Sequence, residues 1–293
     1  MKGRTRMCDR ILHCLLTNRS KKVHPTIFLF PIFFLFLFAI GLPNSFAEGI
    51  NSQAAVVMDA STGEILYAKN SDYLLFPAST TKLMTAIIVI EKANLTEIVT
   101  ISQKAAQAHP FKVGFKKGDK VTIESLLFAA LLKSANDAAV ALAEAVAGSE
   151  ESFVALMNEK AALIGAANTR FINATGLPGI GQYITALDLS KIMKYGMSYS
   201  KLKEILATPS AEVSTEKGKA IFLKNTDKLL WSDEQIIGGK TGYTNSAKHC
   251  FVFAAERDGK IIIVSLLGSP TRKNLWKEAR KLADQGFQMI ARQ

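Results

Sequence analysis

The pattern of apolar and polar positions divides the chain into strands, then helices, then strands and a last helix. Two short apolar runs flank the polar segment 59–63, and two more flank 256–260. Each pair predicts a β-hairpin, because turn-forming residues that include a glycine lie between the runs. The four runs that we interpret as strands are residues 54–58, 64–68, 251–255 and 261–267.

Helical periodicity fills the middle of the chain, from residue 80 to about residue 206, and it returns from residue 272 to about residue 290. In residues 80–92, apolar positions recur three and four residues apart, as on one face of a helix. Side chains that cap helix N-termini precede several later helices. The capped helices that we predict are 123–133 after Thr122, 138–147 after Asp137, a helix after Ser149 that ends near Gly165, and 189–197 after Thr185.

This order of elements predicts a mixed α/β fold. We expect one antiparallel sheet, completed by both ends of the chain and flanked by helices, with an all-helical lobe inserted between its strands. No internal repeat or low-complexity segment interrupts the pattern.

The first 47 residues have the composition of an export signal. A basic stretch with seven Lys and Arg against one acid precedes an almost entirely apolar run at residues 26–42, and small residues follow. We predict a signal peptide over residues 1–47, with an uncleaved membrane anchor as the alternative. In both cases residues 48–293 would form one domain outside the cytoplasm, in the periplasm or at the outer face of the membrane.

Charge, cysteine and histidine content argue against several classes of function. Without residues 1–47 the net charge falls from +11 to +5, because seven of the 36 basic residues and one of the 25 acids lie there. No basic run beside aromatic residues remains, so nucleic-acid binding is not expected. Cys250 is then the sole cysteine, and we expect a buried strand thiol. His109 and His249 alone do not make a metal cluster.

Ser79-x-x-Lys82 places a hydroxyl and an amine three residues apart at the start of a predicted helix. Residues three apart share a helix face, so the amine can reach the hydroxyl and, when neutral, remove its proton. Burial and repulsion from a second lysine would keep Lys82 neutral. Alone the pattern is weak, because helix surfaces produce it by chance. Ser200 with Lys203 and Ser214 with Lys217 repeat it.

Two further patterns distinguish among the three serines. Ser134-x-Asn136 is the only Ser-x-Asn and Lys240-Thr-Gly242 the only Lys-Thr-Gly, and they follow Ser79 in order, after 55 and a further 106 residues. A helix cap and a strand start are their plainer interpretations. Functionally, Lys240 and the hydroxyl of the next residue can hold a substrate carboxylate, and Gly242 leaves room for a peptide along the strand.

The three patterns in this order resemble those of the low-molecular-mass penicillin-binding proteins, the serine D-Ala-D-Ala carboxypeptidases. The resemblance extends from about residue 54 to residue 287 and implies a β-lactamase/transpeptidase-like fold. Stretches that carry it include PASTTKLMTA after Phe76, KSANDAAVALAE after Leu132 and GKTGYTNSAKHC after Gly238.

The resemblance implies a role for each matching residue, with peptidoglycan stem peptides as substrates, β-lactam antibiotics as covalent inhibitors, and no metal or organic cofactor. The implied roles are nucleophile for Ser79, proton acceptor for Lys82, proton relay to the leaving D-alanine for Ser134, substrate backbone contact for Asn136, carboxylate binding for Lys240 and Thr241, substrate room at Gly242, and oxyanion binding by the backbone N–H groups of Ser79 and Tyr243.

The chain departs from this family at a few positions. Ala135 replaces a frequent glycine, and Lys248 stands where many members have glycine, which bears on the rim of the cleft. Many members also carry a C-terminal β-domain and an amphipathic tail, and we expect neither after residue 293. Membrane contact would then come only through an uncleaved leader.

Three alternative functions share the same residues. A D,D-endopeptidase would differ only in the groove around the carboxylate site. A β-lactamase requires a glutamate for deacylation, and no acid lies between Glu159 and Asp188. A non-catalytic penicillin-binding sensor would not need the intact set of serines and lysines.

Overall fold

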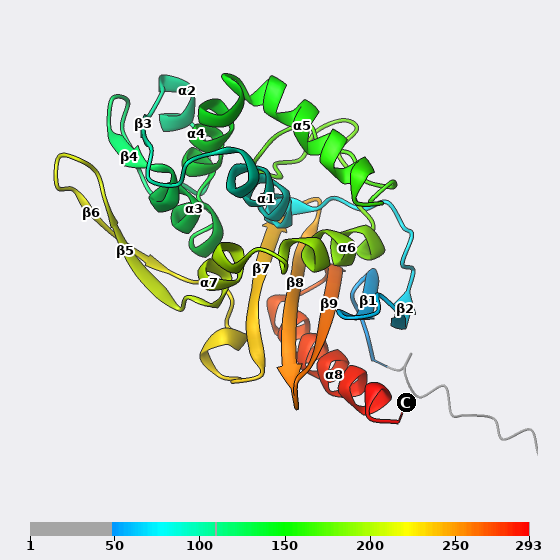
Figure 1. Ribbon diagram of the computed structural model, residues 1–293. Helices are drawn as coiled ribbons and strands as arrows, with labels where there is room; N and C mark the ends of the chain where they lie inside the picture. Colours follow the sequence, from blue (N-terminus) through cyan, green and yellow to red (C-terminus); the bar gives the residue numbers. More distant parts are fainter. Residues whose placement is uncertain (1–48, 109, 293) are drawn as a thin grey trace, which may run out of the picture. The chain divides into compact units, whose positions relative to one another are not determined.

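The computed structural model describes residues 49–108 and 110–292, so the predicted leader at residues 1–47 lies outside the described residues. Its centre is an antiparallel sheet in the order β2-β1-β9-β8-β7, which both ends of the described chain complete (Figure 1). The strands are β1 (Ala54–Asp59), β2 (Ile65–Lys69), β7 (Ile236–Thr244), β8 (Lys248–Arg257) and β9 (Lys260–Ser269). The predicted antiparallel sheet is confirmed.

Both faces of the sheet are covered by helices. Alternate residues of a strand point to opposite faces, and in β1 Val56 packs with the helical lobe while Val57 packs with α8 (Arg272–Ile290). A Cβ at Gly286 of α8 would lie 2.8 Å from Val57 Cγ1, so this glycine lets the helix approach the sheet closely. Burial on both faces explains why the three central strands β1, β9 and β8 are mostly apolar.

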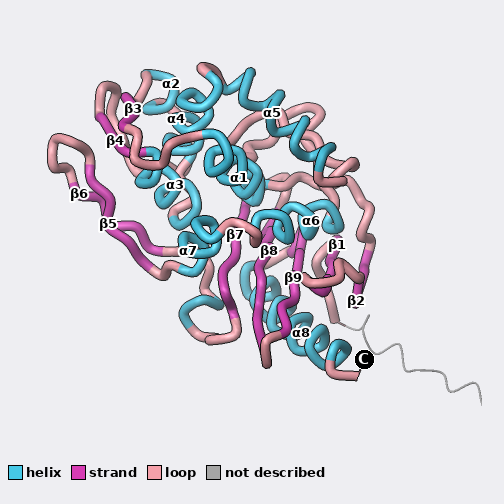
Figure 2. The backbone as a smooth tube through the Cα atoms, viewed as in Figure 1, coloured by secondary structure: helices cyan, strands magenta, loops and turns pink. Residues whose placement is uncertain are grey.

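The helical lobe lies between β2 and β7 in the sequence, as predicted (Figure 2). At its centre is α1, whose residues 82–89 are all buried, because neighbouring helices surround it. The helices are α1 (Lys82–Lys92), α2 (Gln103–Ala106), α3 (Ile123–Leu132), α4 (Asn136–Ala147), α5 (Glu150–Leu163), α6 (Ala186–Gly196), which packs on the sheet, and α7 (Ser200–Ala207).

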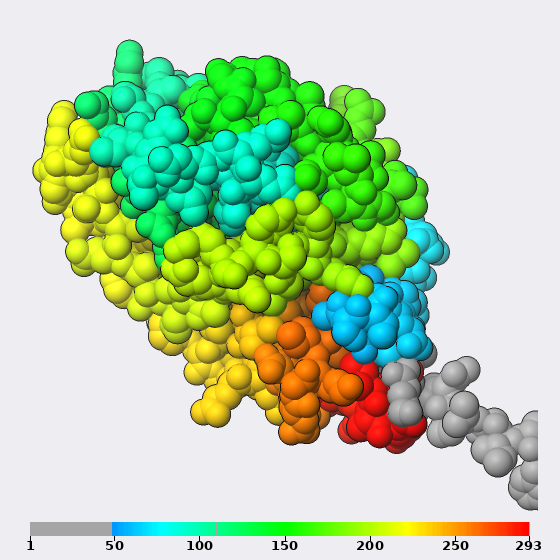
Figure 3. Space-filling model, in the orientation of Figure 1, coloured from blue at the N-terminus to red at the C-terminus, as the bar shows by residue number. Residues whose placement is uncertain are grey.

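Two small antiparallel strand pairs lie outside the main sheet. Strands β3 (Ile98–Thr100) and β4 (Lys120–Thr122), which are separated in the chain by α2, pair with each other, and β5 (Ser210–Ser214) and β6 (Ala220–Lys224) form a hairpin. The space-filling view shows the β5–β6 hairpin, in yellow, at the surface beside the lobe (Figure 3). No helix in the described part of the chain is long and apolar enough to span a membrane.

Several local predictions are confirmed. The β1–β2 and β8–β9 hairpins form, and Thr122, Ser149 and Thr185 each cap a helix by accepting a backbone N–H. Cys250 is a buried thiol on β8, and burial raises its pKa to about 12.

Three local predictions are wrong. The helix predicted from residue 80 begins as a 3₁₀ turn over Ala78–Thr81, and the α-helix starts at Lys82. Asp137 does not cap α4, because it lies inside the first turn and its carboxylate accepts N–H groups from residues 113–115 instead. The Lys-Thr-Gly sequence lies in the second half of β7, whereas its plainer interpretation was a strand start.

Candidate active site

Lys82 is fully buried at the first position of α1, directly after the 3₁₀ turn that carries Ser79. Its Nζ lies 3.1 Å from Ser79 Oγ, 2.7 Å from Asn136 Oδ1 and 2.7 Å from the main-chain oxygen of Thr175. A neutral amine has two N–H groups and one lone pair. Donation to the two carbonyl oxygens therefore leaves the lone pair directed at the Ser79 hydroxyl.

Burial holds the pKa of Lys82 well below its usual value, and the positive charge of Lys240 lowers that pKa further. The negative charge of Asp137 acts in the opposite direction. These are the two causes expected from the sequence, with burial the larger. A buried amine with a lowered pKa can accept the proton of Ser79.

Ser134 and Asn136 lie where α3 ends and α4 begins. The main chain of Ser134 has a φ of 60°, in the left-handed region, which fixes the sharp bend between the helices. Asn136 is held by its own backbone N–H, which donates to the oxygen of Phe111, and by its side-chain amide, which donates to the oxygen of Pro110. The bend thus presents Ser134 Oγ to the cleft and Asn136 Oδ1 to Lys82.

Lys240 lies on β7, fully buried, and connects that strand to the α3–α4 bend. Its Nζ is 3.1 Å from Ser134 Oγ and donates to the main-chain oxygen of Thr241 at 2.8 Å. Burial lowers the pKa of Lys240 to about 7, and the nearby Asp227 opposes this shift. Burial also raises the pKa of Asp227 to about 6.

Thr241 and Gly242 have different environments on β7. The Thr241 hydroxyl pairs with that of Thr226 at 2.8 Å. A Cβ at Gly242 would lie 2.9 Å from the backbone nitrogen of Ser79 and 3.0 Å from Ala78 Cβ. Gly242 thus allows β7 to approach the turn that carries Ser79, a packing reason that the sequence did not supply.

β7 is the last strand of the sheet, and among the described residues its edge away from β8 pairs with no other strand. An extended peptide can therefore add to that edge through main-chain hydrogen bonds. Tyr243, on the same strand, has a side chain 40% exposed whose ring lies 4.5 Å, between centroids, from that of His249.

Five of the expected site residues line one cleft, together with aromatic and basic side chains, and the other three lie directly behind it. No described residue in its lining carries a carboxylate. The lining is Ser79, Phe111, Lys133, Ser134, Thr226, Thr241, Gly242, Tyr243, His249, Arg272, Leu275 and Trp276.

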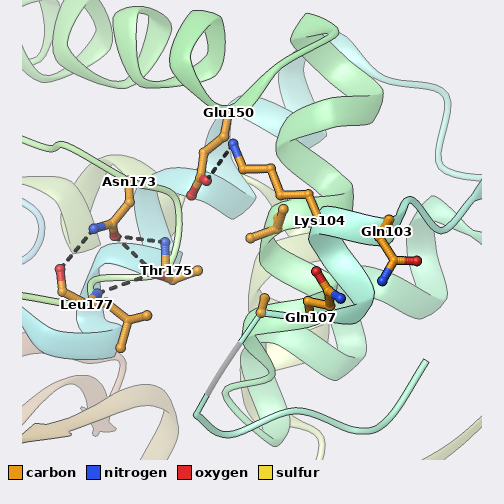
Figure 4. A pocket seen from close by; sticks show the side chains of 9 residues that line it. Gln103, Lys104, Gln107, Glu150, Asn173, Thr175 and Leu177 are labelled. Atoms are coloured by element: carbon orange, nitrogen blue, oxygen red, sulfur yellow. Dashed lines mark hydrogen bonds and ion pairs between the residues drawn. The ribbon is translucent and has the colours of Figure 1, made fainter. Parts of the chain in front are cut away.

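A separate cavity of about 660 Å³ lies beyond Thr175, whose oxygen binds Lys82 (Figure 4). Lys104 and Glu150, both in its lining, form an ion pair at 3.3 Å, and Glu150 also accepts the backbone N–H of Ala174. The carboxylate of Glu150 is thus occupied by structural contacts.

All eight residues expected from the sequence are described, and they meet at this cleft or directly behind it. Sequence reasoning missed Thr175, Thr226 and Asp227, because a main-chain acceptor and two polar loop residues leave no pattern in a sequence. Within the described residues, no group of three or more His, Cys, Asp or Glu could hold a metal ion. His109 lies outside the described residues.

Comparison with known proteins gives consistent matches. The Peptidase_S11 family model, described as D-alanyl-D-alanine carboxypeptidase, matches residues 43–271. The chain is 34% identical to D-alanyl-D-alanine carboxypeptidase DacF of Bacillus subtilis over 80% of its own length and 62% of that of DacF. It is 36% identical to DacB2 of Mycobacterium tuberculosis, over 80% and 82% of the two chains.

Among solved structures, the Streptomyces K15 DD-transpeptidase superposes with a TM-score of 0.77 at 34% identity, covering 81% of this chain and 97% of the other. The expected transpeptidase-like fold is therefore confirmed. The chain spans less than two thirds of the length of DacF, whereas it spans nearly all of the K15 structure.

Proposed function

The chain belongs to the S11 peptidase family of D-alanyl-D-alanine carboxypeptidases, and on that premise we propose that it hydrolyses the terminal D-Ala-D-Ala bond of peptidoglycan stem peptides. The observation that carries the proposal is the environment of Lys82. Its buried amine, with two N–H groups bound and a lowered pKa, lies 3.1 Å from Ser79 Oγ.

Acylation begins when Ser79 Oγ attacks the carbonyl carbon of the penultimate D-alanine and its proton passes to Lys82 Nζ. The negative charge on the carbonyl oxygen is held by the backbone N–H groups of Ser79 and Tyr243. When the C–N bond breaks, Ser134 relays to the leaving nitrogen the proton that Lys82 took from Ser79, so Lys82 becomes neutral again. Lys240 Nζ, 3.1 Å from Ser134 Oγ, holds that hydroxyl in place. Free D-alanine departs and an ester to Ser79 remains.

Deacylation reverses the roles with water. Lys82 removes a proton from a water molecule, the hydroxide attacks the ester carbon, and Ser79 recovers its proton as the shortened peptide leaves. No further reactant is needed. Lys240 and Thr241 bind the terminal carboxylate of the substrate, and Asn136 contacts the substrate backbone.

The cleft favours a peptidase over a β-lactamase. A β-lactamase of the related kind uses a glutamate to activate the deacylating water, and the described lining holds no carboxylate. Glu150 is bound to Lys104 beyond Thr175. A bulky penicilloyl ester on Ser79 would then be hydrolysed slowly, so we also propose that β-lactams inhibit the protein covalently.

We propose in addition that the protein acts outside the cytoplasm, because its substrate is part of the cell wall and residues 1–47 have the composition of a signal peptide. Mass spectrometry of the protein purified from its native cell envelope tests this proposal. We expect an N-terminus at Glu48, and an intact N-terminus in a cytoplasmic fraction would contradict it.

The test of the catalytic proposal is release of D-alanine from diacetyl-Lys-D-Ala-D-Ala by residues 48–293. We expect release by the unchanged protein and none by Ser79→Ala. Ser200→Ala is the matched control, because Ser200 heads another Ser-x-x-Lys sequence but is exposed on α7. Equal release by Ser79→Ala and the unchanged protein would refute the assignment.

A further inference from the structure

A second cavity adjoins the active-site cleft on the side of Thr241. Its volume is about 380 Å³, and it shares Thr226 and Arg272 with the lining of the cleft. The other residues that line it are Lys224, Asn225, Lys228 and Trp231. We call it the basic cavity.

The basic cavity carries three cations that are not neutralised. Lys224, Lys228 and Arg272 are exposed, and none has an ion-pair partner among residues 49–108 and 110–292. Lys224 Nζ lies over the ring of Trp231, 4.7 Å from its centroid, which orients the amine at the cavity. The adjacent acid, Asp227, is fully buried and accepts a backbone N–H from residue 229, so it does not line the cavity.

The position of the basic cavity relates it to the leaving group. The Thr241 hydroxyl, which would bind the carboxylate of the terminal residue, lies 2.8 Å from that of Thr226 in the wall of the basic cavity. The acyl part of a substrate remains on Ser79, so groups beyond Thr241 belong to the departing amino acid. The side chain of D-alanine is a single methyl group, which has no charge to pair with Lys224 or Lys228.

We propose, resting on the function proposed above, that the basic cavity is a subsite for a leaving group that carries a second carboxylate. The bond cleaved and the proton transfers stay the same, and only the departing amine differs. A second carboxylate would meet the amines of Lys224 and Lys228, which is electrostatically complementary. The groove beside the carboxylate site is also what distinguishes trimming of peptide ends from cutting of cross-links, since cross-linked peptides have larger leaving groups.

Three peptides test this subsite: diacetyl-Lys-D-Ala followed by D-Ala, D-Glu or D-Gln. D-Glu and D-Gln have the same shape and differ in charge. We expect kcat/KM for the D-Glu peptide to exceed that for the D-Gln peptide about three- to tenfold, the range for two partly exposed ion pairs. In about 1 M NaCl, where the Debye length is about 3 Å, the preference should largely vanish.

The double variant Lys224→Gln/Lys228→Gln should bring the D-Glu to D-Gln ratio close to one, while turnover of the D-Ala peptide stays unchanged. Lys217→Gln is the matched control, because Lys217 is exposed at the turn of the same β5–β6 hairpin but outside the cavity lining. A preference for D-Glu that survives the double variant, or that is absent in the unchanged protein, would overturn the proposal.

Binding separates this inference from the proposed function. In Ser79→Ala protein, calorimetric titration should show the same preference for the D-Glu peptide over the D-Gln peptide, without any turnover. Equal affinities would reject the subsite even if D-alanine is released normally. If instead the unchanged protein releases no D-alanine, the proposed function fails, and the titration still decides whether the cavity binds a second carboxylate.

Discussion

Lys82 and Lys240 are both fully buried amines, but their surroundings prepare them for different tasks. Lys82 is bound to two carbonyl oxygens and is repelled by Lys240, so its neutral form is favoured. Burial lowers the pKa of Lys240 to about 7 although Asp227 opposes this shift, and a bound substrate carboxylate would bring that pKa back toward its usual value. One lysine is thus suited to take a proton and the other to bind an anion.

Lys240→Ala should lower kcat/KM for substrates with a free terminal carboxylate much more than for amidated substrates. Removal of one partner of a desolvated charge pair costs about 2–5 kcal/mol, whereas an amide loses no such pair. The measurement is kcat/KM for diacetyl-Lys-D-Ala-D-Ala and for its C-terminal amide. Lys133→Ala, an exposed lysine in the cleft lining, serves as the control. An equal loss for both peptides would show that Lys240 does not bind the carboxylate.

The same Lys240→Ala variant should shift the pH dependence of acylation to higher pH. The positive charge of Lys240 lowers the pKa of Lys82, so removal of that charge should raise the pKa of Lys82. Because acylation needs the neutral amine, the rise of the acylation rate with pH should then occur at higher pH. The measurement is the second-order rate of labelling by a fluorescent penicillin as a function of pH. A rise that stays at the same pH, or moves to lower pH, would contradict the electrostatic effect of Lys240 on Lys82.

Substitution by glycine should have opposite effects on Tm at Lys248 and at Ala135, the two departures from the family. Lys248 has a φ of 57°, where a side chain costs about 1–2 kcal/mol, and Ala135 has an ordinary φ of −65°. Lys248→Gly should therefore raise Tm by about 2–4 °C, corresponding to about 1 kcal/mol. Ala135→Gly should lower Tm, because glycine there adds only backbone freedom to the unfolded chain. Changes of the same sign would be inconsistent with this account.

The contact between β7 and the 3₁₀ turn of Ser79 is the element-level feature on which the site depends. β7 carries Lys240 and Thr241, to which we assign carboxylate binding, and the turn carries the proposed nucleophile. Gly242 sets the distance between them. The prediction that Gly242 gives a substrate peptide room on the strand remains untested, and it is compatible with this packing role.

Gly242→Ala should reduce acylation by penicillin about 100-fold, because a displacement of about 1 Å near the reacting atoms costs that much. The new Cβ would lie 2.9 Å from a backbone atom, so β7 or the turn must move. Gly259→Ala is the control. It lies in the β8–β9 turn with open space around a Cβ, so its strained φ of 73° should lower stability without affecting acylation. Normal acylation by Gly242→Ala would show that this contact does not set the geometry.

The sequence predicted those elements whose local pattern matches their place in the fold. The capped helices and the two apolar hairpins could be predicted, because local propensity and tertiary structure agree there. β7 was not, since its sequence IIGGKTGYT contains three glycines and a lysine, and pairing with β8 forms the strand. Burial alternates along β5 and β6, but only Val213 and Leu223 are fully buried, so the apolar signal of these short strands is weak. Asp137 was wrongly predicted as a helix cap, because the N–H groups that it accepts belong to residues 113–115, which are remote in sequence.

The site as a whole draws on segments that are far apart in the chain, and only their order could be read from the sequence. That order selected Ser79 among three candidates, and the structure supplies a physical contrast. Lys82 is fully buried, whereas Lys203 and Lys217 are exposed, so desolvation acts on the first alone. The acceptor oxygen of Thr175 and the acid Asp227 could not be found from the sequence, because their roles depend on the folded chain.

The most direct test of Ser79 as the nucleophile is mass spectrometry of the protein after incubation with penicillin. We expect one penicilloyl group per molecule, attached to the peptide that contains Ser79 and persisting long after excess penicillin is removed, because no carboxylate lines the described cleft to activate water. A label on Ser200 or Ser214 would contradict the assignment of the nucleophile. Turnover of many equivalents of penicillin per second, without a trapped ester, would contradict the peptidase account in favour of a β-lactamase.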